Sequence, residues 1–290
     1  MMISRRRFIV QCGMLAASAA VMAHSRASAT DEAAFRRVME KAGTEGWSNE
    51  PIGRIVELTG LSFTGTPYVA HSLEVRGGER LVVDLRGFDC TTFVESMLAL
   101  SRCIQLGLST FGSFRDQLQR IRYRGGVIQG YPSRLHYFVD WVDDNAVKGI
   151  VRDVTKDLGG IPYVKAIDFM STHTSAYRQL ADPENLRLIK AREDEINARR
   201  HFYLPVEEIP AAAQHMQPGD IVGVVTAETG IDVSHVGIAV MAGGELKFLH
   251  APLSGGKVEV SQGALAGYLS ARPGRTGAIV ARPLNAKQQE

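Results

Sequence analysis

The feature that most constrains the fold is a strongly periodic segment from Thr91 to Leu106. Four apolar residues recur there at the spacing of one helix face: Phe93, Met97, Leu100 and Ile104. The loop-like sequence Gly87-Phe88-Asp89-Cys90 leads into the segment, and Gly107 is suited to end it. We therefore predict a helix that packs one face on a core and begins close to Cys90.

The last third of the chain shows short apolar runs separated by turn residues, which is typical of strands. Strands are predicted at 219–225, 234–241 and 245–250, with shorter candidates at 257–260 and 278–281. Upstream, the patterns predict helices over 31–61, 91–106, 114–118, 133–147 and 183–200, and two short strands at 73–75 and 81–83. A helix that carries a cysteine, followed by an antiparallel sheet that carries histidines, predicts the α+β class.

The N-terminus has the pattern of an export signal. Arg5, Arg6 and Arg7 precede an apolar stretch that runs to Ala23, and Ala27-Ser28-Ala29 offers a small-residue cleavage site. The paired arginines followed by Phe8 resemble a twin-arginine signal. A membrane anchor is the alternative, but the apolar run is shorter than the roughly 20 residues that span a bilayer. We predict a signal at 1–29, an exported and periplasmic protein, and no stable membrane insertion after cleavage.

The net charge argues against a nucleic-acid partner. The formal charge is +2, but the leader holds four arginines and no acidic residue, so without it the basic side chains no longer outnumber the 31 acidic ones. No basic stripe with interleaved aromatic residues occurs elsewhere, so no nucleic-acid binding is expected. We predict that residues 30–290 form a single domain.

Three cysteines are present, and Cys12 lies in the leader. Cys90 and Cys103 are 13 residues apart on the predicted helix, which at 1.5 Å per residue is roughly 20 Å and excludes a disulfide. A helix N-terminus lowers the pKa of a thiol, so Cys90 is a candidate nucleophile. The alternative for Cys90 is a small buried apolar residue, and Cys103 fits that alternative better.

A cysteine nucleophile needs a base that a third polar group orients. His235 opens one predicted strand and His250 ends the next, so an antiparallel hairpin can bring them together. Two structural histidines are the alternative. His173, His201 and His215 lie in polar or irregular segments and are expected at the surface.

Five segments in order resemble the NlpC/P60 papain-like cysteine peptidases. They are Gly65-Thr66-Pro67-Tyr68-Val69, Gly87-Phe88-Asp89-Cys90-Thr91-Thr92-Phe93-Val94, Pro218-Gly219-Asp220-Ile221-Val222, Ser234-His235-Val236-Gly237-Ile238 and Leu249-His250-Ala251. Ser133-Arg134-Leu135-His136-Tyr137 and Asp140-Trp141 resemble the DUF1460 branch, which is N-acetylmuramoyl-L-alanine amidase-like. The resemblance implies a papain-like α+β core, with the nucleophile at a helix N-terminus packed on an antiparallel sheet and a family-specific insertion at about 111–215.

The resemblance also implies roles for single residues. It makes Cys90 the nucleophile, His235 the base and His250 the third polar residue. Tyr68 and Asp89 match positions on the substrate side of the cleft, although Asp89 can instead cap the helix.

Four more residues are expected at the substrate. Thr91 stands where the wider superfamily has serine and keeps its hydroxyl, and Ser234 precedes the predicted base. His136 and Tyr137 are branch-specific and either line the cleft or pack, with Trp141, into the core.

The predicted reaction is amide hydrolysis in peptidoglycan or muropeptides, between the lactyl group of N-acetylmuramic acid and L-alanine, without cofactor or metal. Three alternatives remain open. They are a γ-D-glutamyl-diamino acid endopeptidase, a non-catalytic wall-binding module, and a zinc hydrolase that uses His235, His250 and a carboxylate. No HExxH-type motif supports the last.

Overall fold

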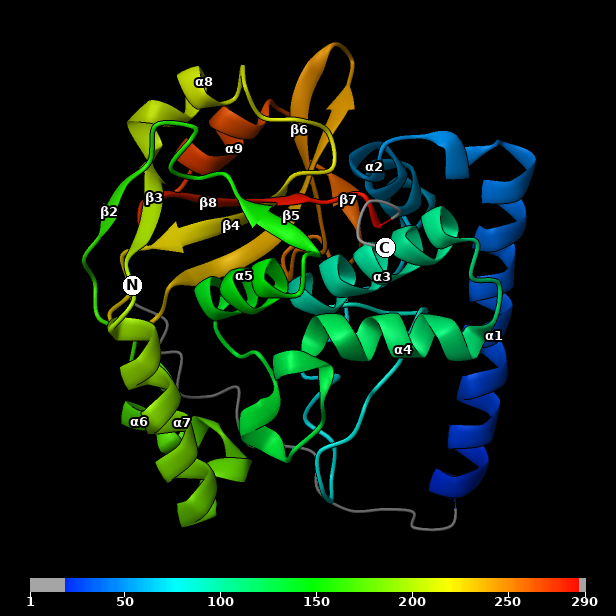
Figure 1. Ribbon diagram of the computed structural model, residues 1–290, viewed down its shortest axis with the longest axis horizontal. Helices are drawn as coiled ribbons and strands as arrows, with labels where there is room; N and C mark the ends of the chain where they lie inside the picture. The colour runs from blue at the N-terminus through cyan, green and yellow to red at the C-terminus, as the bar shows by residue number, and fades with distance from the viewer. Residues whose placement is uncertain (1–18, 287–290) are drawn as a thin grey trace.

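The computed structural model describes residues 19–286, and its centre is an antiparallel β-sheet (Figure 1). The strand order is β2-β3-β8-β4-β5-β6-β7, and β1 also pairs with β8. The strands are β1 Val151–Asp153, β2 Ile161–Tyr163, β3 His201–Pro205, β4 Ile221–Thr226, β5 Val233–Ala242, β6 Glu245–His250, β7 Glu259–Val260 and β8 Arg275–Pro283. The mixed helical and antiparallel architecture confirms the predicted α+β class.

Helices lie on both faces of this sheet (Figure 1). They are α1 Ala19–Thr44, α2 Ile52–Ser62, α3 Cys90–Leu106, α4 Phe111–Arg122, α5 Phe138–Val147, α6 Phe169–Thr172, α7 Pro183–Asn197, α8 Ile209–Ala212 and α9 Leu265–Ser270. Short 3₁₀ turns are η2 Trp47–Asn49, η3 Arg124–Gly126, η4 Tyr131–Ser133, η5 Thr174–Ala176, η6 Arg178–Ala181 and η7 Val206–Glu208. Within the described residues, no helix combines the length and the apolar character needed to cross a membrane.

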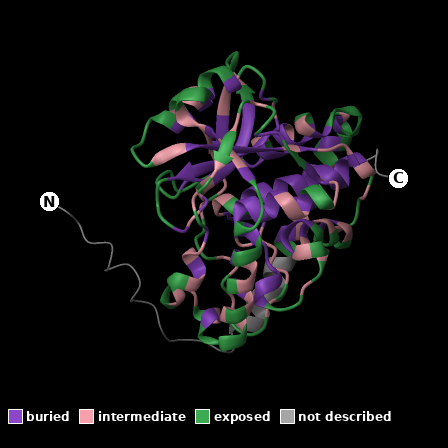
Figure 2. Ribbon diagram, turned by 60° about the vertical axis from the view of Figure 1, so that its left-hand side comes forward, coloured by how far each residue is buried: buried purple, intermediate pink, exposed green. Residues whose placement is uncertain are grey.

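The alternation of side chains along the strands builds two cores. Ile221 and Val225 of β4 join the larger core beneath α2, α3 and α5, whereas Val222 and Val224 point to a smaller core beneath α8 and α9. The sheet is therefore apolar on both faces, and Figure 2 shows its strands and α3 as the most buried parts of the molecule.

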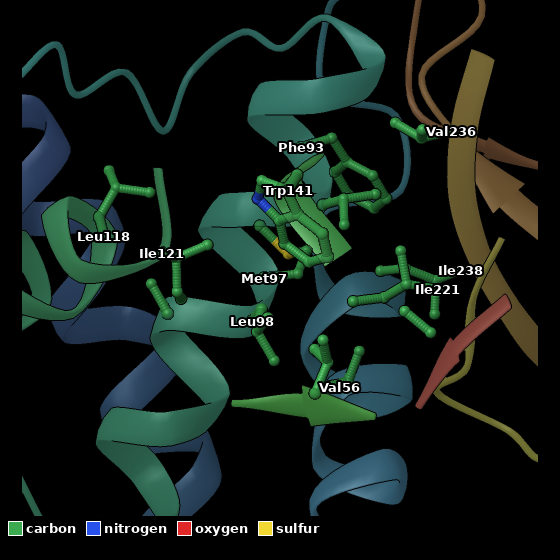
Figure 3. Packing of buried hydrophobic residues seen from close by; sticks show 14 of the residues in the cluster. Val56, Phe93, Met97, Leu98, Leu118, Ile121, Trp141, Ile221, Val236 and Ile238 are labelled. Carbon is green, nitrogen blue, oxygen red and sulfur yellow. The ribbon is translucent and has the colours of Figure 1, made fainter. Parts of the chain in front are cut away.

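Helix α3 is the central element of the larger core. Its Phe93, Met97 and Leu98 are fully buried and lie between α4, α5 and the strands (Figure 3). At its N-terminus the Asp89 side chain accepts from the backbone N–H of Thr92 at 2.8 Å, and Gly107 ends it with a φ of 70°. The position of Cys90 is thus fixed by a capped helix with a buried stripe.

Several sequence predictions are confirmed, and others are wrong. The predicted helix over 91–106, its end at Gly107, and the strands at β4, β5 and β6 are confirmed. The predicted helix over 31–61 is interrupted after α1, where Gly46 has a φ of 71°, and resumes after Pro51 as α2. Strands β1, β2 and β3 were not predicted.

The predicted strands at 73–75 and 81–83 are wrong, because side chains bind this backbone where a neighbouring strand would. The Arg122 guanidinium donates to the Val82 carbonyl, and the Tyr123 hydroxyl donates to the Arg80 carbonyl. The predicted helix over 133–147 begins only at Phe138. Leu135 N–H donates to the Arg122 carbonyl instead, so His136 and Tyr137 lie in extended backbone before α5.

The predicted export signal lies mostly outside the described residues, which begin at Ala19 inside α1. Residues 111–215, predicted as an insertion, contain β1 and β3, and both strands pair with β8 of the central sheet. This segment is therefore built into the sheet as well as around it.

Candidate active site

A cavity of about 210 Å³ lies between the N-terminus of α3, the start of β5 and the chain before α5. Six of the predicted site residues line it: Cys90, Thr91, His136, Tyr137, Ser234 and His235. The rest of its surface is mostly apolar and includes Leu135, Trp141, Met170 and Val233. Tyr68, Asp89 and His250 do not line this cavity. Each lies next to a residue that does: Asp89 precedes Cys90, Tyr68 is near Cys90, and His250 contacts His235.

Cys90 is the first residue of α3 and is half-buried. Its thiol lies against the start of β5, because the backbone N–H of Val236 contacts the sulfur, as do the N–H and hydroxyl of Thr91. Burial, with a smaller contribution from the Asp89 carboxylate, raises the pKa of Cys90 to about 11, although these contacts lower it. The expected low thiol pKa is thus wrong, because desolvation by burial outweighs the contacts that favour the thiolate.

His235 and His250 form a direct pair, with His235 Nε2 at 2.8 Å from His250 Nδ1. The hairpin of β5 and β6 brings them together, and His250 is buried. Burial lowers the pKa of His235 to about 4 and that of His250 to about 3, and Arg272 and Arg275 lower both. Both imidazoles are therefore neutral at pH 7.

A group of aromatic side chains surrounds the histidine pair, and sequence reasoning missed it. Phe248 stacks on His250 with ring centroids 4.9 Å apart, and Tyr268 of α9 contacts the rings of Phe248 and His250. Gly237 makes room, since a Cβ there would lie 2.6 Å from Phe248 Cζ. Phe248 could have been found, because it shares a strand face with His250, but no sequence signal pointed to Tyr268.

Asp89 caps α3, which is one of the two roles predicted for it. Its carboxylate accepts from both the N–H and the hydroxyl of Thr92 at 2.8 Å. It also lines a second cavity, of about 190 Å³, together with Glu74, Arg134 and His136. Burial raises the pKa of Tyr68, and the nearby Cys90 and Asp89 raise it further. Tyr68 therefore stays protonated near Cys90 and can donate a hydrogen bond.

His136 and Tyr137 form the wall opposite Cys90. The His136 ring nitrogen Nε2 lies 3.0 Å from the Tyr131 carbonyl, and burial lowers the pKa of His136 to about 3. The Tyr137 hydroxyl donates to Glu193 at 2.7 Å and accepts from Met170 N–H at 2.9 Å. Tyr137 and Trp141 are buried and also line the cavity, so both predicted alternatives hold for them.

Among the described residues, no group of three or more His, Cys, Asp and Glu side chains is arranged to hold a metal ion. His235 Nε2 and His250 Nδ1 lie 2.8 Å apart, a distance at which the N–H of one imidazole donates to the nitrogen of the other. The site therefore holds a thiol and a neutral imidazole in the lining of one cavity, with a second imidazole paired to the first.

Comparisons with known proteins point to cell-wall amide hydrolysis. A family model described as N-acetylmuramoyl-L-alanine amidase-like matches residues 58–276. The crystal structure of an N-acetylmuramoyl-L-alanine amidase from Bacteroides uniformis is 37% identical, covers 80% of this chain and 99% of its own, and superposes with a TM-score of 0.76. The comparison with curated proteins gives no match.

Two further solved structures are similar. A Bacteroides fragilis protein described as a candidate xylanase is 40% identical, covers 78% of this chain and 99% of its own, and has a TM-score of 0.73. A Legionella pneumophila protein of the DUF1460 family is 19% identical, covers 90% of this chain and 96% of its own, and has a TM-score of 0.68. The last likeness concerns the fold alone.

Proposed function

The chain belongs to the N-acetylmuramoyl-L-alanine amidase-like family, and from this premise we propose that it is a cysteine amidase of peptidoglycan fragments. The proposed bond is the amide between the lactyl group of N-acetylmuramic acid and L-alanine. One observation carries the cysteine mechanism: Cys90 and His235 line the same cavity, and His250 binds the far nitrogen of His235 at 2.8 Å.

The mechanism follows from the neutral states of the Cys90 thiol and the His235 imidazole. Because His250 occupies His235 Nε2, the nitrogen left to serve Cys90 is His235 Nδ1. It accepts the thiol proton as the sulfur attacks the amide carbonyl, and it then protonates the departing amine of L-alanine. Water hydrolyses the resulting thioester, which releases the muramic acid carboxylate and restores the thiol.

The oxyanion of the tetrahedral intermediate needs donors that are already in place. We assign this role to backbone N–H groups at the N-terminus of α3 and to the Tyr68 hydroxyl, whose pKa is raised by burial. In comparable sites the loss of one such donor lowers kcat by about 10²–10³-fold.

Glycoside cleavage is a weaker alternative, although one similar structure is described as a candidate xylanase. That reaction uses two carboxyl groups that flank the scissile bond. Among the described residues, Glu95 and Asp232 are the carboxylates that line the cavity. Glu95 binds the Arg122 guanidinium at 2.6 Å, and Asp232 accepts the backbone N–H groups of Val139 and Val233, so both are engaged elsewhere.

The decisive experiment is mass spectrometry of muropeptides digested with the wild-type protein and with Cys90→Ala. We expect the wild type to release an intact stem peptide that begins with L-alanine, and the variant to release none. Cys103→Ala is the matched control, because Cys103 is a fully buried thiol remote from the cavity. Undiminished turnover by Cys90→Ala would remove the thiol mechanism, and a fragment beginning at the diamino acid would support the endopeptidase instead.

Two finer assignments belong to the same proposal. A nucleophile at a helix N-terminus, packed against an antiparallel strand that carries the base, supports a papain-like core of the NlpC/P60 superfamily. The arginine-rich N-terminus supports export to the periplasm, in keeping with a cell-wall substrate. Cell fractionation tests the second: an Arg5→Lys, Arg6→Lys variant should accumulate in the cytoplasm, and unchanged export would reject a twin-arginine signal.

A further inference from the structure

Two potential donors converge on one nitrogen behind the proposed base. His235 Nε2 lies 2.8 Å from His250 Nδ1, and the Tyr268 hydroxyl oxygen lies 3.5 Å from the same atom. In this contact the hydroxyl can donate to His250 Nδ1 or accept from it, depending on the tautomer of His250. Tyr268 is not among the residues that line the cavity.

The position of one proton decides whether His235 can act as a base. A neutral imidazole carries a proton on one nitrogen and a lone pair on the other. If His250 Nδ1 held a proton and donated it to His235 Nε2, the proton of His235 would sit on Nδ1, which then could not accept another. If His250 Nδ1 is the acceptor, His235 carries its proton on Nε2 and its Nδ1 is free.

We infer that Tyr268 is a positioning residue whose hydroxyl donates to His250 Nδ1 and thereby selects the tautomer that leaves His235 Nδ1 unprotonated. This inference rests on the proposed cysteine amidase and adds to it the element that sets the protonation of its base. The contact at 3.5 Å is long for a hydrogen bond, so its contribution is a bias between two tautomers and is smaller than that of His250 itself.

The surroundings of Tyr268 hold its ring and keep its proton. The Arg275 guanidinium lies 4.1 Å from the centroid of the ring and also donates to the Tyr268 carbonyl. The ring contacts His250 edge-on, with centroids 4.9 Å apart, and lies at the same distance from Phe248. Burial raises the pKa of Tyr268 above its ordinary value, so the hydroxyl remains a donor throughout the neutral range.

The direct test reads the tautomers by NMR of ¹⁵N-histidine-labelled full-length protein at pH 7. We expect His250 to be protonated on Nε2 and His235 on Nε2, with both Nδ1 atoms unprotonated. Signals are assigned by their loss in His250→Asn and His235→Asn. A wild-type spectrum with the proton on His250 Nδ1 would overturn the inference without the need for a Tyr268 variant.

The kinetic test uses Tyr268→Phe, which removes the hydroxyl and keeps the ring on Arg275 and Phe248. We expect kcat on muropeptides to fall about threefold to tenfold, the range of one modest hydrogen bond, with KM unchanged. The population of the His235 Nδ1–H tautomer should rise in the same variant. Tyr203→Phe is the matched control, since Tyr203 lies on β3 and packs on Tyr163, outside the cavity.

The outcomes separate this inference from the proposed function. If Cys90→Ala is inactive while Tyr268→Phe keeps wild-type kcat and wild-type tautomers, Tyr268 is only a ring spacer and the inference is wrong. If Cys90→Ala stays active, the cysteine mechanism itself fails, whatever Tyr268→Phe does. A fall in kcat with an equal loss of folded protein by circular dichroism would assign Tyr268 a purely structural role and contradict the inference.

Discussion

The two walls of the cavity are built in different ways. The wall with Cys90 and His235 consists of the capped helix α3 and the hairpin of β5 and β6, whose backbones satisfy their own hydrogen bonds. The opposite wall is extended backbone before α5, held by buried side chains from distant parts of the chain, such as Glu193 on α7. Regular elements therefore position Cys90 and His235, and long-range polar contacts hold the extended chain that lines the other side of the cavity.

Asp232 joins the two walls. It precedes β5, and its carboxylate accepts the N–H of Val233 at 2.8 Å and the N–H of Val139 in α5 at 2.9 Å. Burial raises the pKa of Asp232, which these backbone donors counteract. One buried carboxylate thus ties the start of β5 to the start of α5.

The largest effect is expected on the catalytic wall, from His235→Ala. Loss of the general base should lower kcat about 10²–10⁴-fold, because the proposed mechanism then lacks its acceptor for the thiol proton. Circular dichroism should show a folded protein, since His235 is only half-buried. His215→Ala is the control, as His215 is exposed and outside the cavity, and equal losses in both variants would contradict the assigned base.

The pH dependence of kcat/KM should show the next largest effect. With the pKa of His235 at about 4 in place of 6.5, the base stays unprotonated at pH 5, and kcat/KM there should remain within about twofold of its value at pH 7. An ordinary histidine would be mostly protonated at pH 5, and kcat/KM would fall about 25-fold from its value at pH 7. A fall of that size would show that the site is more hydrated than its geometry indicates.

The effect of pH on stability is the opposite of the effect expected for a histidine whose pKa is raised by a salt bridge. Between pH 6.5 and about 4 the unfolded chain binds a proton on His235 that the folded protein does not bind. The free energy of unfolding therefore falls as the pH falls through this window. The rates at pH 5 need a parallel check of the folded fraction by circular dichroism.

The same difference between the walls explains what the sequence could predict. The helix over 91–106, Cys90 at its start and the two histidines on a hairpin follow from local periodicity and turn residues. The extended chain at His136 and Tyr137 could not be found, because the Arg122 carbonyl, the Tyr131 carbonyl and Glu193 hold it there, and no local pattern reports such partners. The strands predicted at 73–75 and 81–83 failed for the same reason.

Glu193 offers a test of the opposite wall. Its Oε1 accepts from the Tyr137 hydroxyl at 2.7 Å and from Ser171 N–H at 3.1 Å, so Glu193→Ala leaves two buried donors unpaired. We expect the free energy of unfolding to fall by about 1–3 kcal/mol in urea titrations, and KM to rise several-fold with little change in kcat. Glu193→Gln keeps an acceptor oxygen and should lie near wild type. A selective fall in kcat would place Glu193 in the catalytic machinery instead.

The smallest effect on KM, about twofold, is expected from Tyr137→Phe, which removes the hydroxyl and keeps the ring on the cavity wall. The loss of two hydrogen bonds, one to Glu193 and one at 2.9 Å from Met170 N–H, should cost about 1–3 kcal/mol in the free energy of unfolding. Combined with Glu193→Ala, its effect should be less than additive, because both changes break the same hydrogen bond. Full additivity would mean that Glu193 supports the opposite wall only through its hydrogen bond with Ser171 of α6.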